Sequence, residues 1–114
     1  MMEKLLVIIV MVALLAIAAL FFLGLRSQSG EPSGLVEGRL KPCPDTPNCV
    51  NSEFAVDARH YIEPLGFEAE QAAVVLPALK TVILDMGGRI RVEEPGYMAA
   101  TFTSALFRFV DDLE

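Results

Sequence analysis

The sequence is poor in the residue types that usually build catalytic and metal sites. Among its 114 residues it has one histidine, His60, and two cysteines, Cys43 and Cys49. A structural zinc site takes four such ligands, so a metal is poorly supported, and no cofactor is expected. The chain also lacks a phosphate-binding glycine loop, a nucleophile elbow and a zinc-protease helix. No catalytic residue is therefore assigned from the sequence.

Basic residues are scarce as well, since nine Lys and Arg stand against fifteen Asp and Glu, for a formal net charge of −6. Net acidity argues against nucleic acid as a partner, because neutralising phosphates needs clustered Lys or Arg. It argues in the same way against electrostatic attachment to anionic lipid. A negative balance otherwise serves to keep a domain soluble.

Polar side chains are missing from one long segment, Leu5 to Leu25. As a helix this segment would be about 31 Å long, close to the hydrocarbon thickness of a bilayer. A secretory signal has a shorter apolar core, so an uncleaved signal-anchor is favoured over cleavage before Gly30 or a buried core helix. Since no cysteine directly follows the run, a lipoprotein anchor is excluded. We expect residues 1–26 to be a transmembrane anchor that contacts bilayer lipid through residues 5–25.

Two rules disagree on which side of the membrane the rest of the chain lies. Arg26, Arg39 and Lys41 follow the apolar run and only Lys4 precedes it, so the positive-inside rule does not favour export. The cysteine pair favours export, because disulfides persist in oxidising compartments. The short N-terminal tail offers few charges to count, so the cysteines receive more weight. We expect a single-pass protein of a bacterial inner membrane with its domain in the periplasm.

The part after the anchor divides into a linker and one small domain. Residues 27–39 are rich in Ser, Gly and Glu and predict a flexible linker, and residues 40–114 predict an α+β domain. The segment from Glu68 to Met86 follows the helical period. Pro77 should either kink this helix or delay its start, with an extended lead-in before it.

Alternating apolar and polar residues predict the strands of an antiparallel sheet on which this helix packs. A short strand is expected at residues 59–63, where the alternation is partial. In the last strand Phe107 and Phe109 should share one face, with Arg108 on the other. The further strands are expected at residues 89–93, 97–103 and 106–110.

The spacing of the two cysteines allows three interpretations: a structural disulfide, a metal site, or free and redox-active thiols. A disulfide between Cys43 and Cys49 would close a seven-residue loop and stabilise a domain of this size by at most about 2.4 kcal/mol. A metal site lacks further ligands, and a thioredoxin-like motif has two intervening residues where this chain has five. The structural disulfide is favoured.

Four polar residues are candidates for function: His60, Arg108, Asp111 and Asp112. A catalytic histidine needs a nucleophile and an orienting group, and spacing alone places neither, so a packed histidine bonded to a carbonyl is favoured. Strand alternation puts Asp111 and Asp112 on opposite faces, which weakens a paired role. Asp112 and Glu114 would share a face, which leaves a weak cation site as an alternative to a solvated chain end.

Three segments together resemble the domain-of-unknown-function family fourteen ninety-nine. The first is Pro42-Cys43-Pro44 followed by Pro47-Asn48-Cys49-Val50, the second is His60 with Ile62, Pro64 and Leu65, and the third is Leu106-Phe107-Arg108-Phe109-Val110-Asp111-Asp112. The resemblance runs from Leu40 to Glu114 and implies an envelope or organelle-lumen protein without an established activity. Asn51 stands where the pattern usually has serine. The family pattern usually continues with another strand and a last helix, so the chain is expected to be a truncated member, a gene fragment or a divergent short form.

The sequence therefore supports two classes of function. The first is a membrane-anchored, non-enzymatic binding or structural module of the envelope, which binds an envelope protein or a lipid through its sheet or helix face. The second is a thiol-redox protein or hydrolase that uses Cys43 and Cys49, or His60 with Asp111. The first is favoured, because a structural disulfide needs only two cysteines whereas a catalytic site needs several side chains in a fixed arrangement. A non-functional fragment is a third alternative.

Overall fold

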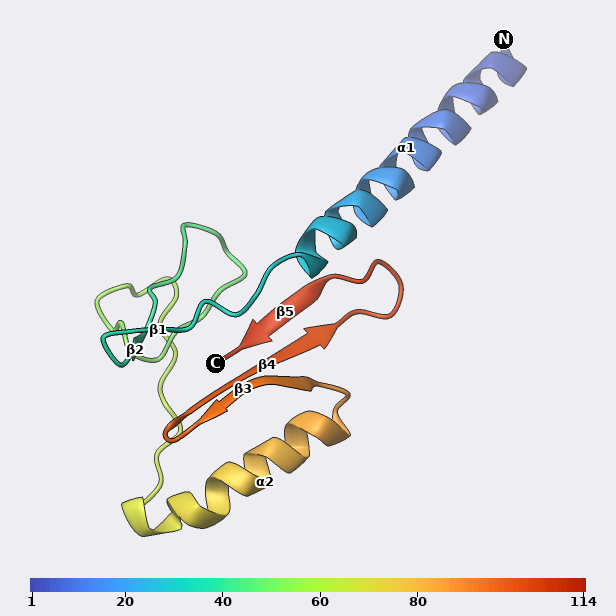
Figure 1. The fold of residues 1–114 in the computed structure, drawn as a ribbon. Helices are drawn as coiled ribbons and strands as arrows, with labels where there is room; N and C mark the ends of the chain where they lie inside the picture. The colour runs from blue at the N-terminus through green and yellow to red at the C-terminus, as the bar shows by residue number, and fades with distance from the viewer.

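The computed structural model describes residues 1–114 and shows one long helix that projects from a small mixed domain (Figure 1). Helix α1 (Met2–Gln28) is exposed along its length except at Gly24, which is buried, and Ser27, which is half-buried, and it is long and apolar enough to cross a membrane. It continues through Ser27 and Gln28, two residues that were expected in the linker. The anchor segment therefore ends inside a regular helix and not at a flexible joint.

A two-stranded hairpin occupies the end of the predicted linker. Strand β1 (Leu35–Val36) pairs with β2 (Arg39–Leu40) in antiparallel register. The turn residues Glu37 and Gly38 both have positive φ, 53° and 76°, as the favoured two-residue hairpin turns require. The segment 27–39 is thus partly regular, although its composition indicates flexibility.

The domain is built on an antiparallel sheet in the order β3-β4-β5. Strands β3 (Arg89–Glu94) and β4 (Tyr97–Thr103) confirm the two predicted strands, and Pro95-Gly96 forms the turn between them. Strand β5 is Val110–Leu113, so the expected strand at 106–110 is wrong. Arg108 has a φ of 61°, in the left-handed region, and this interrupts the extended backbone that the Phe-Arg-Phe alternation predicts.

The strand expected at residues 59–63 is also wrong. A single parallel bridge joins Asn51 to Tyr61, and the surrounding segment is irregular. Partial alternation was a weak signal, and no second strand lies beside Tyr61 to extend the ladder.

Helix α2 (Ala72–Asp85) follows a 3₁₀ turn, η1 (Ala69–Gln71). A capping box between Glu68 and Gln71 begins the turn, with the Glu68 N–H donating to Gln71 Oε1 at 3.0 Å. The helix runs through Pro77, so of the two effects expected of this proline the delayed start is wrong. At its end Gly87, with a φ of 87°, and the Gly88 N–H, which donates to the Ile83 carbonyl at 2.8 Å, form a Schellman cap.

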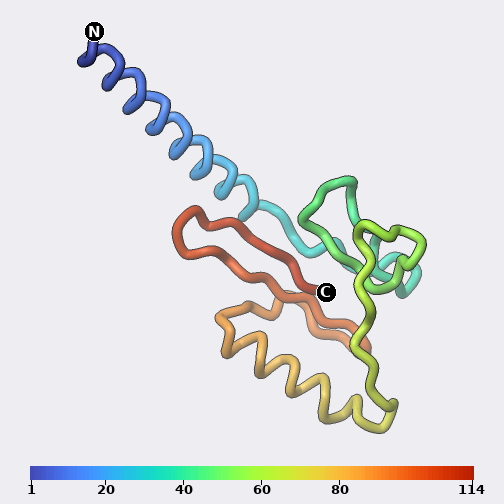
Figure 2. The backbone as a smooth tube through the Cα atoms, turned by 180° about the vertical axis from the view of Figure 1, so that it is seen from behind, coloured from blue at the N-terminus to red at the C-terminus, as the bar shows by residue number.

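The helix covers one face of the sheet, where Ile83 is buried, and Ala99 and Ala100 are buried in the middle strand (Figures 1 and 2). Gly88 lets these layers meet, because a Cβ there would lie 2.8 Å from the Phe102 ring. The hairpin and residues 41–65, here called the disulfide lobe, lie beside the end of β5 (Figure 2). The fold is α+β, as the element order predicts.

Candidate functional site

A disulfide joins Cys43 and Cys49, whose Cα atoms are 5.7 Å apart, and no cysteine is free. Asn51 fixes the start of this loop, because its Nδ2 donates to the Lys41 carbonyl at 2.8 Å. The Oδ1 of Asn51 accepts from the Glu53 N–H at 2.7 Å, which makes a local turn. The loop is therefore closed by a covalent bond and by a buried amide that spans it.

His60 ties the disulfide loop to the rest of the lobe. Its side chain is buried, with Nε2 at 2.8 Å from the Thr46 carbonyl oxygen and Nδ1 at 2.7 Å from Asp57 Oδ2. Both partners are acceptors, so both ring nitrogens donate when the imidazole is charged. The hydrogen bond to Asp57, followed by that to Thr46, raises the pKa of His60 above its ordinary value.

The same geometry limits the chemistry of His60. A general base needs a ring nitrogen that reaches a substrate proton, and both nitrogens here have protein partners. An ion pair between Arg59 and Asp45 adds a second connection between this segment and the loop. These contacts, here called the clasp, hold the disulfide loop against the segment that contains Asp57, Arg59 and His60.

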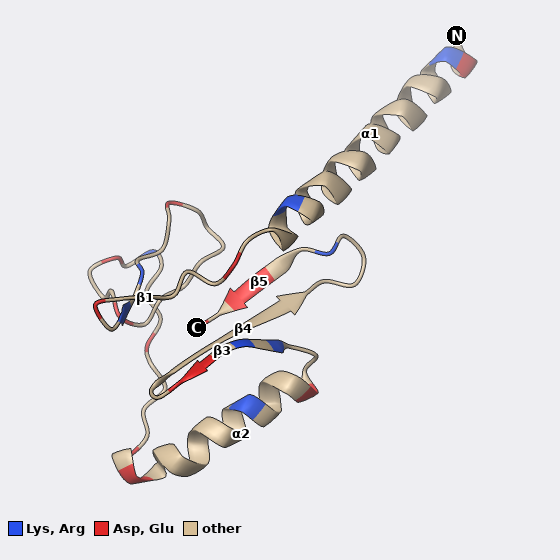
Figure 3. Ribbon diagram, in the orientation of Figure 1, with Lys and Arg blue, Asp and Glu red and all other residues tan.

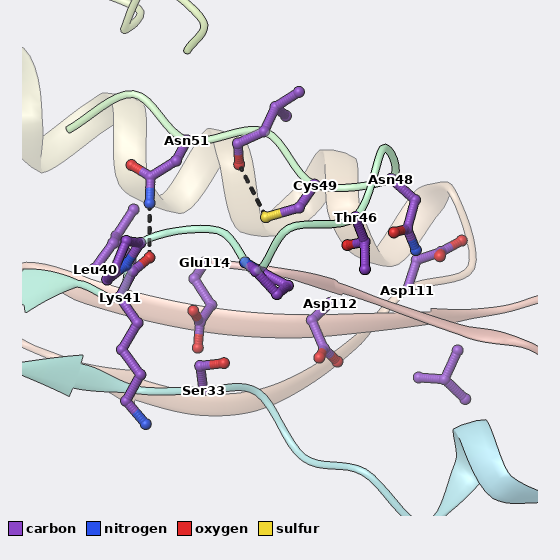
Figure 4. Close-up of a pocket in the computed structure, with 14 residues that line it drawn as sticks. Ser33, Leu40, Lys41, Thr46, Asn48, Cys49, Asn51, Asp111, Asp112 and Glu114 are labelled. Carbon is purple, nitrogen blue, oxygen red and sulfur yellow. Dashed lines mark hydrogen bonds between the residues drawn. The ribbon is translucent and has the colours of Figure 1, made fainter. Parts of the chain in front are cut away.

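A hollow of about 470 Å³ lies between the disulfide loop and β5 (Figure 4). The loop contributes Asn48 and Cys49, and β5 contributes Asp111 and Asp112. Burial, together with the charges of Glu114 and Asp111, raises the pKa of Asp112. The wall formed by β5 is therefore acidic, whereas the opposite wall presents the amides of Asn48 and Asn51 and one charged residue, Lys41 (Figure 4).

Glu114 closes one end of this hollow. Its Oε1 accepts hydrogen bonds from the Gly34 N–H at 2.7 Å and from the Tyr97 hydroxyl at 2.8 Å. Burial and the bond to Glu114 raise the pKa of Tyr97 to about 12. These bonds connect the segment before the hairpin, the middle strand and the chain end.

The structure brings some of the sequence candidates together and separates others. Cys49, Asp111 and Asp112 line one hollow, while His60 lies outside it and contacts the loop through Thr46. Arg108 lies in the β4–β5 loop and lines a different hollow. No group of three or more His, Cys, Asp or Glu residues is arranged to hold a metal ion.

Sequence reasoning missed Asn51, which is buried and has both side-chain polar atoms bonded. An asparagine directly after a proline-rich cysteine loop is a signal for a turn, and this signal was available. It also missed Ser27, whose hydroxyl bonds to Val110 of β5, a residue 83 positions away in the sequence. No local pattern could have revealed that contact.

Comparison with known proteins finds one family. A family model described as "Protein of unknown function (DUF1499)" matches residues 39–114. The match includes the disulfide loop, His60 and the acidic strand. No curated protein and no solved structure matches the chain.

Proposed function

We propose that this chain, which belongs to the DUF1499 family of proteins of unknown function, is a membrane-anchored, non-enzymatic binding module whose domain is held at the membrane surface. The observation that carries the proposal is the contact between the end of α1 and the β4–β5 loop. A free tether would leave the domain independent of its anchor, whereas this contact fixes the domain relative to the helix axis.

Three neighbouring residues of α1 make the contact. Gly24 is buried against the backbone of Phe107, and the rings of Phe21 and Phe107 meet edge to face with centroids 5.3 Å apart. One turn later, Ser27 Oγ donates to the Val110 carbonyl at 3.2 Å and accepts from the Val110 N–H at 2.8 Å. The Ser27 side chain thus satisfies both backbone groups of Val110 at the start of β5, as a neighbouring strand would.

The proposed compartment of the domain rests on the apolar helix and the disulfide. A single apolar helix near the N-terminus suits a single-pass protein, and a disulfide suits an oxidising compartment. We place the protein in a bacterial inner membrane with its domain in the periplasm. Intact cells exposed to a protease should lose the domain only when the outer membrane is permeabilised, and digestion only after lysis would contradict the orientation.

A binding role is supported by how the reactive side chains are engaged. Both cysteines are bonded to each other, and both nitrogens of His60 have protein partners. The hollow beside the disulfide loop offers three carboxylates, from Asp111, Asp112 and Glu114, against one cation, Lys41, which suits a basic or amide-rich segment of an envelope protein.

The test is affinity purification of the full chain from solubilised membranes. We expect one stoichiometric partner whose binding Asp112→Lys abolishes, because the substitution replaces a carboxylate of the β5 wall by an ammonium group. Glu70→Lys makes the same charge change on the 3₁₀ turn before α2, outside the hollow, and should leave the partner bound. Recovery of the chain alone, or equal recovery with both variants, would contradict a partner in this hollow. Release of the chain from membranes by alkaline carbonate would contradict the anchor.

A further inference from the structure

Several arginines of the domain gather near the end of α1, although the net charge of the chain is negative. Arg26 ends the apolar run, Arg108 lies in the β4–β5 loop, and Arg89 and Arg91 begin β3, all at the end of the sheet nearest α1 (Figure 3). Glu93 and Glu94 lie at the far end of β3, whereas Asp112 pairs with Thr101 in the same row as Arg89, and Asp111 pairs with Phe102 one row nearer α1. Net acidity therefore does not describe the surface that faces the end of the anchor.

Three of these arginines line one small hollow of about 150 Å³ between the sheet and the end of α1. Arg89 and Arg91 come from β3 and Arg108 from the β4–β5 loop, and none of the three forms an ion pair. Asp112 pairs with Thr101 and the charge of Arg91 acts to lower its pKa, but Asp112 does not line the hollow. Three unpaired guanidinium groups around a small space without a carboxylate favour an anion.

The other lining groups suit an oxyanion. Thr101 and Thr103 project from β4, where Thr101 pairs with Arg89 in register, and Gln28 contributes an amide from the end of α1. Hydroxyl and amide donors beside planar guanidinium forks match the tetrahedral oxygens of phosphate. The donor set is richer than the scattered arginines of an ordinary surface.

The position of the hollow along α1 indicates that the phosphate belongs to a lipid headgroup. The Phe107 ring packs on Phe21, about 7.5 Å before Arg26 along the helix axis, so the tip of the β4–β5 loop lies at the level of the apolar run. Leu106 beside it is an exposed apolar residue. Arg108 follows directly, at the level where an anchor of this length leaves the hydrocarbon and enters the headgroups.

We propose that the hollow lined by Arg89, Arg91 and Arg108 binds the phosphodiester of a phospholipid headgroup, while Leu106 and Phe107 enter the outer part of the bilayer. The proposal rests on the membrane anchoring put forward above, because a domain away from the membrane would not meet this ligand. It gives the surface-held domain a second attachment, made by charge distribution and not by net charge.

The experiment is native mass spectrometry of the full chain released from detergent micelles with added lipid. We expect the chain to retain phosphatidylglycerol and not dioleoylglycerol, which has the same kind of acyl chains without a phosphate. Each lost guanidinium–phosphate contact should weaken retention about tenfold, so Arg89→Gln with Arg91→Gln should weaken it about a hundredfold. The charge-keeping pair Arg89→Lys and Arg91→Lys should retain part of the binding.

The matched control is Lys41→Gln with Lys80→Gln, which removes the same charge from residues outside the hollow. Equal retention by the two glutamine pairs would overturn the proposal, as would equal retention of phosphatidylglycerol and dioleoylglycerol. Displacement by inorganic phosphate with no preference among lipids would assign the hollow to a free anion and overturn the lipid assignment. A chain that resists carbonate extraction but shows no headgroup preference would overturn this inference alone, whereas loss of the chain from membranes would overturn the anchoring itself.

Discussion

The backbone carbonyl of Phe107 lies directly against Gly24, with no room for a side-chain carbon between them. The glycine sits within a helix, where it costs roughly 1 kcal/mol relative to alanine. The close approach of the β4–β5 loop accounts for a glycine at this position. The joint between anchor and domain therefore depends on the absence of a methyl group.

Gly24→Ala should separate α1 from the loop, because its Cβ would collide with backbone that cannot move as a side chain does. We expect a loss of roughly 1–3 kcal/mol, typical of overpacking, and faster proteolysis within residues 104–109 of the detergent-solubilised chain. Gly30→Ala is the control, since its Cβ would make only an ordinary 3.5 Å contact with the Ser27 carbonyl oxygen. Similar proteolysis of both variants would contradict the joint.

Removing the disulfide with Cys43→Ser and Cys49→Ser should lower the free energy of unfolding by at most about 2.4 kcal/mol, the closure entropy of a seven-residue loop. The hydrogen bond from His60 to Thr46 should loosen with it, so amide exchange should rise in the lobe before it rises in the sheet. Denaturant unfolding and hydrogen exchange measure the two effects. An unchanged unfolding midpoint would show that the bridge does not constrain the lobe.

The clasp made by His60 predicts a pH dependence with a definite sign. The pKa of His60 is raised in the folded chain above its ordinary 6.5, so its stabilisation is fully present below pH 6.5 and is lost as the pH rises through the folded value. Thermal unfolding should therefore occur at a lower temperature at alkaline pH than at mildly acidic pH. His60→Gln should remove this difference, and a variant that keeps the full difference would assign the dependence to other groups.

Asp112 predicts a second pH dependence at lower pH. Burial and the charges of Glu114 and Asp111 raise the pKa of Asp112 above its ordinary 3.8, so its favourable contribution is present below pH 3.8 and is lost as the pH rises through the folded value. Asp112→Asn should therefore raise the melting temperature at neutral pH and have little effect in acid. Asp85→Asn, on α2 and outside this cluster, is the control. Destabilisation by Asp112→Asn at neutral pH would contradict the repulsion.

The sequence predicts regular elements well where one local pattern decides them. The apolar run, the helix with its Gly87-Gly88 stop and the strands at β3 and β4 follow from periodicity and turn residues. The last strand was misplaced because Phe107 and Phe109 alternate as strand residues do. Their rings instead serve the contact with α1, and Arg108 takes a left-handed conformation between them.

The candidate site was less predictable because its parts are distant in sequence. His60 was expected to bond a carbonyl, and it does, but Thr46 as the partner follows only from the folded loop. The meeting of Cys49 with Asp111 and Asp112, and the gathering of Arg89, Arg91 and Arg108, depend on strand register and on where α1 ends. A linear sequence records the charges of these residues without their neighbours.

The hydroxyl of Ser27 has a mechanical consequence, because it joins the last turn of α1 to the edge strand β5 through both backbone groups of Val110. A transmembrane helix answers a change in bilayer thickness by tilting. In the proposed anchoring, the bond from Ser27 would make the sheet rotate with the tilting helix, and bilayer thickness would then set the angle of the domain to the membrane.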